Sequence, residues 1–500
     1  MRRLACKVGR QNKVEGRQAP AQPEKKLGCQ NGIDIFQKPI SYLRRSKVIP
    51  FLRFFSVASV VATVFFFAWL FLPPGAILIG PVTLRKEDVV RLLPLALVFI
   101  LDPRLLVVRW HWVDIPVFVY CLCPLLCGVA NHLDWQDSLW EMVKEFEYWF
   151  VPYLLGRAVF FDFPSQRRLA ICLIIAAVCL VPPTVFEIVH GPKWTAWLTG
   201  RELVGQERGA LRGSTFKPSV FLSSGFVLTM FYVLATLTAL GLAWDGFIWR
   251  SRWQTPHPNP LPGRPGRGDN GFPLMSLYAI AFVFAVVVVA CKSLGSIVLL
   301  GIGLAVMVAC RCTPVRYWLI PLVLIAPMYI GLRISGLATT DRVDAVAKQF
   351  VSAERAGSLA YRLRAEDIVF QRMQGHWWLG WGDFGLWQQD ANVMALDGFW
   401  LFALTRTGLV SVIAWLAMVT IPIFVFACSR RRQREKHMDQ IGLVFALFLA
   451  LSLVDSMFNY FGDAPQMLLL GGLAGIGIQM VDGKWQMANG KTNMPGDGCS

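Results

Sequence analysis

The chain has 500 residues, of which 55% are hydrophobic and 16% charged, and its formal net charge is +17. Many apolar runs are long enough to cross a bilayer core of about 30 Å, which excludes a soluble globular protein and predicts a polytopic membrane protein. In a soluble protein this charge would suggest nucleic acid as a partner. Here the basic residues flank hydrophobic runs, so we expect no nucleic-acid partner and interpret their distribution as a sign of membrane orientation.

The first half of the chain divides into a tail, a membrane region and a linker. Residues 1–50 are basic and lack a periodic apolar pattern, which predicts a disordered cytoplasmic tail before a retained first span, not a cleaved signal peptide. Residues 51–244 form the first membrane half, with a charged outer loop at 190–218. The stretch 245–273 is rich in Pro, Gly and Arg and predicts a flexible cytoplasmic linker.

The second half begins with membrane helices over 274–334 and continues with a large polar loop at 335–397. Further membrane helices follow over 398–482, and 483–500 is a cytoplasmic tail. The predicted fold is therefore an all-α polytopic membrane protein with about twelve transmembrane helices and a large outer loop. The expected spans are at about 54–72, 89–102, 114–130, 145–161, 168–189, 219–243, 274–291, 294–310, 317–333, 398–427, 441–457 and 465–481.

The basic runs assign the two sides of the membrane. They lie at 44–47, 167–168, 250–252, 264–267, 311–316 and 430–436. Counting spans from a cytoplasmic N-terminus puts every one of these runs inside, as the positive-inside rule requires. The same count puts the loop at 190–218, the short link at 292–295 and the large loop outside.

The centre of the large loop has a helical pattern. Residues 358–374 lack Gly and Pro and carry apolar residues at three- and four-residue spacing, and Gly375 follows. This pattern predicts an amphipathic helix with a glycine C-cap, lying over the membrane core. Glycines on both sides of Trp381 then predict a tight turn, and the chain re-enters the bilayer near Asp397.

Cations on the predicted outer side are candidates for binding an anion, because arginine holds phosphate oxygens with a planar fork of donors. An alternative is that each pairs with a nearby carboxylate, as Glu366 could with the arginine four residues before it, or Asp367 with the arginine three residues before it. A charge at the end of an apolar run is more often functional. The primary candidates are Arg212, Lys292, Arg362 and Arg364, and the secondary ones are Lys217 and Arg372.

Two residues are candidates for acid or base chemistry. Asp397 stands where the loop returns to the membrane, where a carboxylate could accept the proton of an attacking hydroxyl. It could equally cap the following helix, and both roles could hold together. His376 is a secondary candidate, but beside Trp377 and Trp378 it could be an interfacial residue of an aromatic belt.

Several motifs are absent from the sequence. It has no Gly-rich phosphate loop, no paired Asp motif on any loop, and no His or Cys cluster at metal spacing, so we expect neither a metal nor a cofactor. Cys121, Cys123 and Cys127 share one span without His or carboxylate beside them, which favours packing. The outer loops at 191–217 and 335–397 carry no cysteine and hence no disulfide.

The order of these elements resembles the O-antigen ligase and polymerase superfamily of bacterial envelope glycosyltransferases, from about residue 151 to about residue 463. No single motif is specific to that family, and the resemblance depends on motif order together with topology. The elements that carry it are Arg212-Gly213, Lys292-Ser293-x-Gly295, Arg362 before an Ile-Val-Phe helix, Gly380-Trp381-Gly382 and Thr407-Gly408-Leu409.

The resemblance implies an inverting, metal-independent transfer of a glycan from polyprenyl pyrophosphate, such as undecaprenyl pyrophosphate, to an acceptor hydroxyl. It places this reaction at the periplasmic face of the bacterial inner membrane, in assembly of cell-envelope polysaccharide or exopolysaccharide. By position, Arg212 and Arg362, with Lys292 or Arg364, would bind the pyrophosphate. The family usually has His-Asn before the re-entering span, whereas this chain has Asp397-Gly398, and we hypothesise that Asp397 takes over as base or acceptor-orienting group.

The residues leave several alternatives open. The acceptor could be another lipid-linked repeat, as for a polymerase, or a lipid A core or a protein, as for a ligase. A transporter or flippase of an anionic amphiphile or lipid-linked sugar would also need outer cations, although the sequence shows no internal repeat between its halves. A scaffold protein is a third reading, which leaves the arginines of the large loop unexplained.

Overall fold

The computed structural model describes residues 56–73, 76–79, 82–191, 193–194, 197, 211–212, 215–253, 274–313, 316–350, 353–382, 398–429, 440–459 and 463–481. The predicted tails at 1–50 and 483–500 lie outside these described residues, as does the 254–273 part of the predicted linker.

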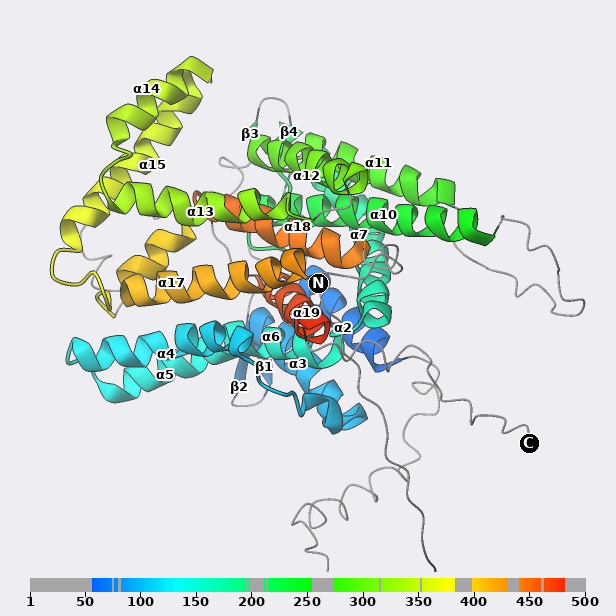
Figure 1. Ribbon diagram of the computed structural model, residues 1–500, viewed down its shortest axis with the longest axis horizontal. Helices are drawn as coiled ribbons and strands as arrows, with labels where there is room; N and C mark the ends of the chain where they lie inside the picture. Colours follow the sequence, from blue (N-terminus) through cyan, green and yellow to red (C-terminus); the bar gives the residue numbers. More distant parts are fainter. Residues whose placement is uncertain are drawn as a thin grey trace, which may run out of the picture. The chain divides into compact units, whose positions relative to one another are not determined.

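Helices dominate the described part of the chain (Figure 1). Those of the first half are α2 (Val57–Phe71), α3 (Lys86–Leu101), α4 (Ile115–Ala130), α5 (Trp135–Glu145), α6 (Val151–Val159), α7 (Phe163–His190) and α10 (Gly225–Trp253). Those of the second half are α11 (Leu274–Ala290), α12 (Leu294–Cys312), α13 (Leu319–Ile334), α14 (Thr340–Phe350), α15 (Ala353–Arg372), α17 (Phe399–Cys428), α18 (Gln440–Asp455) and α19 (Ala464–Val481).

Short elements connect the helices. In the part of the chain that the structure describes, two antiparallel strand pairs occur, β1 (Ala76–Ile79) with β2 (Val82–Arg85) and β3 (Leu211–Arg212) with β4 (Thr215–Phe216). Single 3₁₀ turns lie at η3 (Pro103–Leu106) and η4 (Trp112–Asp114). A π turn, η5 (Phe146–Phe150), joins α5 directly to α6.

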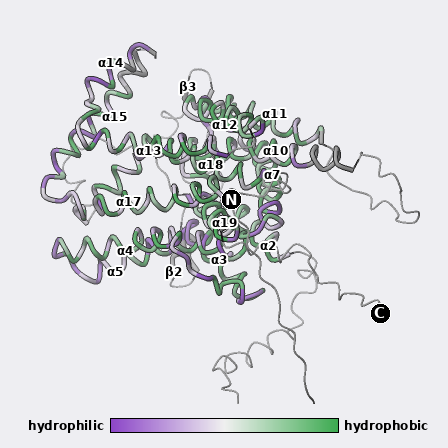
Figure 2. The backbone as a smooth tube through the Cα atoms, viewed as in Figure 1, coloured by the Kyte–Doolittle hydropathy of each residue, from purple (hydrophilic) through white to green (hydrophobic). Residues whose placement is uncertain are grey.

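Ten of the expected spans overlap an apolar helix (Figure 2). The expected span at 89–102 lies in α3, which carries the buried Arg91, and the one at 145–161 consists of the π turn η5 and the nine-residue helix α6. Among the described residues, five helices are long and apolar enough to cross a membrane: Trp112–Ala130, Phe163–His190, Gly225–Asp245, Leu294–Cys312 and Phe399–Cys428. Five further apolar helices are shorter, at Val57–Phe71, Met275–Ala290, Leu319–Ile334, Gln440–Asp455 and Ala464–Met480. The described chain is therefore that of a helical membrane protein.

The structure corrects the sequence expectations at two places. Helix α10 continues to Trp253, so the first residues of the predicted linker are helical; Phe247, Ile248 and Trp249 extend the apolar run, and the first proline comes only at Pro256. The large loop contains α14 in addition to the expected helix, which itself begins at Ala353. In both places the helix continues through a single glycine, Gly246 in α10 and Gly357 in α15, because one glycine inside a helix costs only about 1 kcal/mol and does not end it.

The turn residues of the loop agree with prediction. Gly375 follows α15 with a φ of +87°, and Gly380 and Gly382 have φ values of +65° and +85°. These left-handed conformations suit glycine because a Cβ would clash with the backbone.

Helix α18 forms the centre of the fold. Every residue from Ile441 to Leu453 is buried, which is typical of a helix surrounded by other helices on all sides. Helices α6 and α19 pack closely at glycines: a Cβ added to Gly156 would collide with the backbone of α19, and one added to Gly471 would collide with that of α6. Small residues at such positions let two helix backbones approach each other inside a membrane.

Exposed tryptophans lie at both ends of the α4 and α5 pair. Trp110 and Trp112 lie before α4, Trp135 and Trp140 lie on α5, and all four are more than half exposed. With 16 residues, α4 is about 24 Å long, so the two groups are separated by roughly the thickness of a hydrocarbon core. Tryptophans at this separation are typical of the two interfaces of a membrane.

Contacts join segments that the sequence assigns to the same side. Asn131, in the turn between α4 and α5, donates a 3.0 Å hydrogen bond to the carbonyl of Gly380 in the large loop. On the opposite side, the guanidinium of Arg316 lies 4.5 Å from the ring centroid of Phe426. Each of these two contacts thus joins a pair of segments that the sequence assigns to one side of the membrane.

Candidate functional site

A small pocket lies where the loop helix α15 meets the start of α17 and the end of α18. Its cavity volume is only about 10 Å³, and it is lined by Arg362, Ala365, Glu366, Gly398, Leu401, Met457 and Phe458. The start of α17 is fixed there because the Phe399 amide donates to the carbonyls of Ser456 and Asn459, both at 3.1 Å. A Cβ on Gly398 would lie 2.6 Å from the Met457 carbonyl oxygen, so this contact requires a glycine.

Three segments that are distant in sequence bring charge to the end of α18. Asp455 is its last residue, and both Arg362 and Lys217 lie close enough to interact electrostatically with its carboxylate. Lys217 also interacts with the thiol of Cys291, which directly precedes Lys292. Lys217, at the end of the 190–218 loop, and Arg362 of α15 therefore both act electrostatically on the carboxylate of Asp455.

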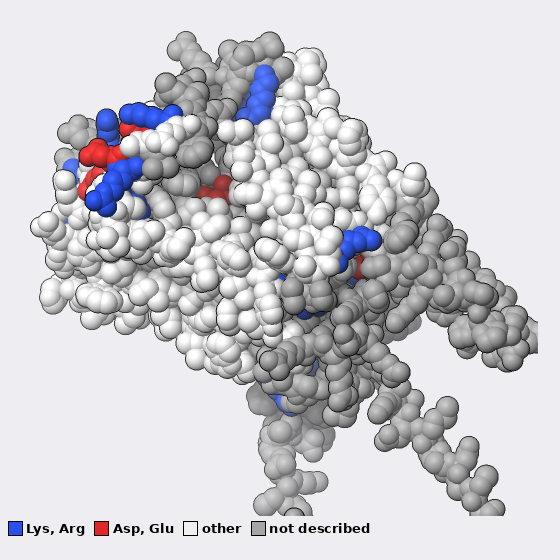
Figure 3. All heavy atoms as spheres, turned by 45° about the horizontal axis from the view of Figure 1, so that its top comes forward, with Lys and Arg blue, Asp and Glu red and all other residues white. Residues whose placement is uncertain are grey.

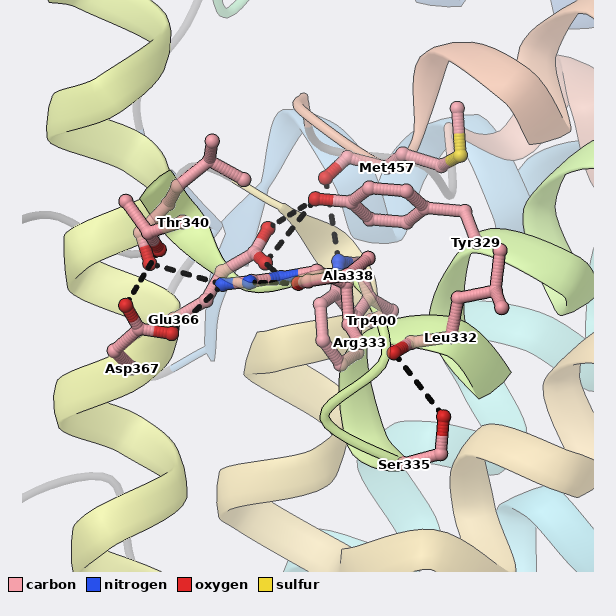
Figure 4. Close-up of polar contacts among 11 residues, drawn as sticks. Tyr329, Leu332, Arg333, Ser335, Ala338, Thr340, Glu366, Asp367, Trp400 and Met457 are labelled. Atoms are coloured by element: carbon pink, nitrogen blue, oxygen red, sulfur yellow. Dashed lines mark hydrogen bonds and ion pairs between the residues drawn. The ribbon is translucent and has the colours of Figure 1, made fainter. Parts of the chain in front are cut away.

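A buried network attaches α15 to α13 (Figure 4). The guanidinium of Arg333 donates to Glu366 at 2.5 Å and to Asp367 at 3.0 Å. The hydroxyl of Tyr329 donates to Glu366 at 2.8 Å, and that of Thr340 to Asp367 at 2.5 Å. Burial raises the pKa of the Glu366 carboxyl above its ordinary value, while the positive charge of Arg333 acts in the opposite direction.

This network changes the interpretation of the loop arginines. Glu366 and Asp367 both bind Arg333, a residue of a different helix, rather than serving only to neutralise arginines of their own helix. Arg364 is exposed, whereas Arg362 is half-buried against the pocket. The structure therefore brings Arg362, but not Arg364, to the pocket.

Three of the other predicted cations do not line the pocket. Arg212 is in β3, in register with Thr215 of β4. Lys292 is exposed in the turn between α11 and α12, with a φ of 53°. Arg372 is the last residue of α15 and is half-buried.

Of the two acid or base candidates, the structure describes His376 but not Asp397. Asp397 lies outside the described residues, although its neighbour Gly398 lines the pocket, so its role stays a prediction. The ring of His376 stacks on that of Trp381, with centroids 4.0 Å apart and an interplanar angle of 16°. This contact favours the interpretation of His376 as part of an aromatic cluster.

Helix α17 is broken at Gly408, whose φ of 78° and ψ of −172° are not helical. The loop closes this break with backbone hydrogen bonds, in an arrangement that we call the break seam. It pairs residues 377–382 with 405–410 through Trp381 N to Thr405 O (2.9 Å), Gly382 N to Arg406 O (2.9 Å), Leu409 N to Trp377 O (2.8 Å) and Val410 N to Trp378 O (3.2 Å). Non-helical backbone at membrane depth is tolerated only when its polar groups are satisfied in this way.

A partly buried arginine, Arg406, lies beside the break seam. Arg406 pairs with Glu141 at 2.6 Å and with Glu145, both from α5. These contacts tie the first half of α17 to the pair formed by α4 and α5.

A further charged group surrounds the link between α18 and α19. Burial raises the pKa of the Asp463 carboxyl to about 6, against the opposing effect of the cations Lys86 and Arg91. Burial also lowers the pKa of Lys86 to about 8, and its ammonium donates a 2.5 Å hydrogen bond to the Phe221 carbonyl.

Sequence reasoning missed Arg333, Asp455 and Arg406, because each was counted inside an apolar span. The signal that singled out Lys292, a charge at the end of an apolar run, would also have found Arg333 and Asp455. The partners of these residues come from distant segments, and no local pattern reveals them.

Charged side chains gather over α14 and α15 on the face shown in Figure 3, while most of that face is uncharged. Within the described ranges, no group of three or more His, Cys, Asp or Glu side chains could hold a metal ion. Cys121, Cys123 and Cys127 are buried with free thiols.

No protein-family model matches the chain, and a search of curated proteins found no match.

Proposed function

We propose that the chain transfers a glycan from a polyprenyl-pyrophosphate lipid to an acceptor hydroxyl during assembly of a surface polysaccharide. The observation that supports this proposal is the meeting of Arg362 and Lys217 around Asp455, beside a pocket on the predicted outer side. Cations at that place suit the pyrophosphate group of a lipid held in the adjacent leaflet.

The proposed chemistry needs charge stabilisation and a proton acceptor. The acceptor hydroxyl attacks the anomeric carbon, the bond from that carbon to the pyrophosphate oxygen breaks, and the leaving group takes the bonding electrons. Arg362 stabilises the negative charge that develops on this leaving group. The hydroxyl proton passes to a carboxylate, for which Asp397 is the predicted residue and Asp455, held beside Arg362, is the second candidate.

The test compares surface and polyprenyl-linked glycans in cells that lack the protein and cells complemented with wild type or Arg362→Ala at matched membrane levels. We expect Arg362→Ala to lose about 10²-fold or more of the transfer, the usual cost of removing a group that stabilises a transition state. The control is Arg342→Ala, because Arg342 is exposed on α14 and donates a 3.1 Å hydrogen bond to the Leu337 carbonyl, away from the pocket.

The outcome also separates the remaining choices. If the deletion strain accumulates short lipid-linked repeats that wild type lengthens, the protein is a polymerase; if complete glycans accumulate untransferred, it is a ligase. If Arg362→Ala restores the normal profile, the proposed role of Arg362 is wrong.

One observation favours the second candidate, a transporter or flippase. Helix α17 is discontinuous at Gly408, and broken membrane helices often form substrate sites in transporters. In this chain the loop backbone occupies the break, so the polar groups of the break seam are already bonded. Reconstituted vesicles decide: a flippase would move a fluorescent lipid-linked sugar across the bilayer without an acceptor, whereas the proposed enzyme would not.

A further inference from the structure

Arg333 is 3% exposed at the end of α13 and contacts two separate stretches of the loop. Its Nε donates to Glu366 at 2.5 Å, and its Nη2 donates to Asp367 at 3.0 Å and to the Leu363 carbonyl at 3.1 Å. Its Nη1 donates to the Ala338 carbonyl at 2.6 Å. A planar guanidinium that makes all these bonds fixes both the position and the rotation of the helix that it holds.

Arg362 lies on the face of α15 that Arg333 holds. Glu366 follows Arg362 by four residues, so their side chains are neighbours on the helix surface, about one turn apart. Both line the same pocket. An anchor at Glu366 therefore determines where the Arg362 guanidinium lies relative to Asp455.

The apolar contacts of α15 also hold this helix in the fold, but they are not directional as the hydrogen bonds of Arg333 are. Leu363, Val369 and Met373 are buried, and apolar burial stabilises the contact in proportion to area. Such packing tolerates small rotations of the helix, whereas the bonds of Arg333 do not. A buried ion pair contributes little net stability, because desolvation offsets most of its attraction. The network is thus better suited to orienting α15 than to holding it in place.

We propose that Arg333 is a positioning residue: through Glu366 and Asp367 it sets α15 against α13 so that Arg362 faces the pocket at the end of α18. The inference rests on the function proposed above only in so far as Arg362 binds the pyrophosphate. Its geometric part is independent of the reaction.

The first test measures geometry without any glycan. The substitution Arg362→Cys is placed in full-length protein in lipid nanodiscs, and its reaction with a polar maleimide is followed by mass spectrometry of the peptide. Because position 362 is half-buried, we expect slow labelling that becomes about fivefold faster when Arg333→Lys or Arg333→Met is added. Arg342→Lys is the matched control and should leave the rate unchanged.

A buried native thiol separates positioning from a general loss of structure. Cys121 is fully buried and should stay unlabelled in all these variants. If its labelling rises by the same factor as that at position 362, Arg333 is only structural. If labelling at position 362 does not change in either Arg333 variant, the proposal is wrong.

The second test is a double-mutant cycle on glycan transfer. We expect Arg333→Lys alone to lower kcat/KM about tenfold, but less than about twofold when Arg362→Ala is already present, because one residue acts through the other. The exchange Arg333→Glu with Glu366→Arg should recover part of the activity. Equal losses in the two backgrounds would contradict the proposal.

The two proposals fail in different ways. If Arg362→Ala alone leaves transfer unchanged, the proposed function of Arg362 is wrong, and the labelling rates still decide whether Arg333 positions α15.

Discussion

Two of the contacts that hold the large loop against the membrane helices use different chemistry. The Arg333 network attaches α15 to α13 through charged side chains, with Glu366 as its most buried carboxylate. The break seam attaches residues 377–382 to α17 entirely through backbone groups. The first depends on residue identity at several positions, whereas the second depends mainly on a glycine that permits the backbone to bend.

The difference follows from the two environments. At the break seam an unbonded amide or carbonyl would be buried without water, so the loop must satisfy every backbone group. At the end of α13 the buried Arg333–Glu366 pair lies next to solvent, since the side chain of Asp367 is 42% exposed. Charged groups can be kept there at a smaller desolvation cost.

The largest effect is expected at Gly408. A valine there would occupy a conformation open almost only to glycine, and its Cβ would collide with the Trp378 carbonyl. Strain and lost backbone bonds together should cost about 4 kcal/mol or more, so Gly408→Val should not yield folded protein. Size-exclusion chromatography and thermal unfolding in detergent measure this. Gly331→Ala, in open space on α13, is the control; a Gly408→Val protein with normal Tm would contradict the role of the break seam.

A smaller loss of stability is expected when Arg333 is removed. Arg333→Met leaves Glu366 buried without its main cation, which should destabilise the fold by about 3 kcal/mol. Adding Glu366→Gln removes the unpaired charge and should restore part of the Tm, whereas no second substitution should rescue Gly408→Val. If the double variant is less stable than Arg333→Met, the network does not behave as a charge pair.

A pH dependence of stability is expected at a third charged site, the carboxyl of Asp463. The charged groups that act on it are Lys86, Arg91 and Glu87 of α3. Its folded pKa of about 6 exceeds the unfolded value of about 3.9. Between these values the folded chain binds more protons, so the contribution of this carboxyl to stability falls as the pH rises. Tryptophan fluorescence should show a shallower fall of Tm over this range in Asp463→Asn than in wild type. Asp137→Asn, at an exposed site on α5, should keep the wild-type slope.

The smallest effect is expected for a side chain of the break seam. The Trp381 side chain stacks on His376, but its backbone amide makes the bond to α17. Trp381→Phe keeps that amide and an aromatic ring, so it should change the stability by less than about 1 kcal/mol. A loss as large as that of Arg333→Met, measured by thermal unfolding under the same conditions, would show that the break seam also depends on side chains.

The helices could be predicted from the sequence because apolar runs and their glycine stops are local patterns. Gly375, Gly380 and Gly382 each adopt the left-handed conformation expected at a turn. Helix α14 was not expected, since its short amphipathic pattern lies in a stretch rich in charge. The extension of α10 was missed because the proline-rich composition of the linker begins after the helix ends.

The candidate site could be predicted only in part. Arg362 was singled out by its place in an outer loop helix, and the structure puts it in the pocket. Asp455 and Arg333 were missed because their significance comes from partners more than 30 residues away, and a single sequence carries no record of such contacts. Local spacing pointed to pairing within α15, whereas Glu366 and Asp367 bind Arg333.

The contact between α6 and α19 also constrains the order in which the protein can assemble. Gly156 and Gly471 bring the two helix backbones together, yet α19 is synthesised about 300 residues after α6, which takes tens of seconds at ordinary translation rates. During that interval α6 is already in the membrane, and its glycine surface has no partner. The first half of the chain therefore remains incompletely packed in the bilayer until α19 has been inserted.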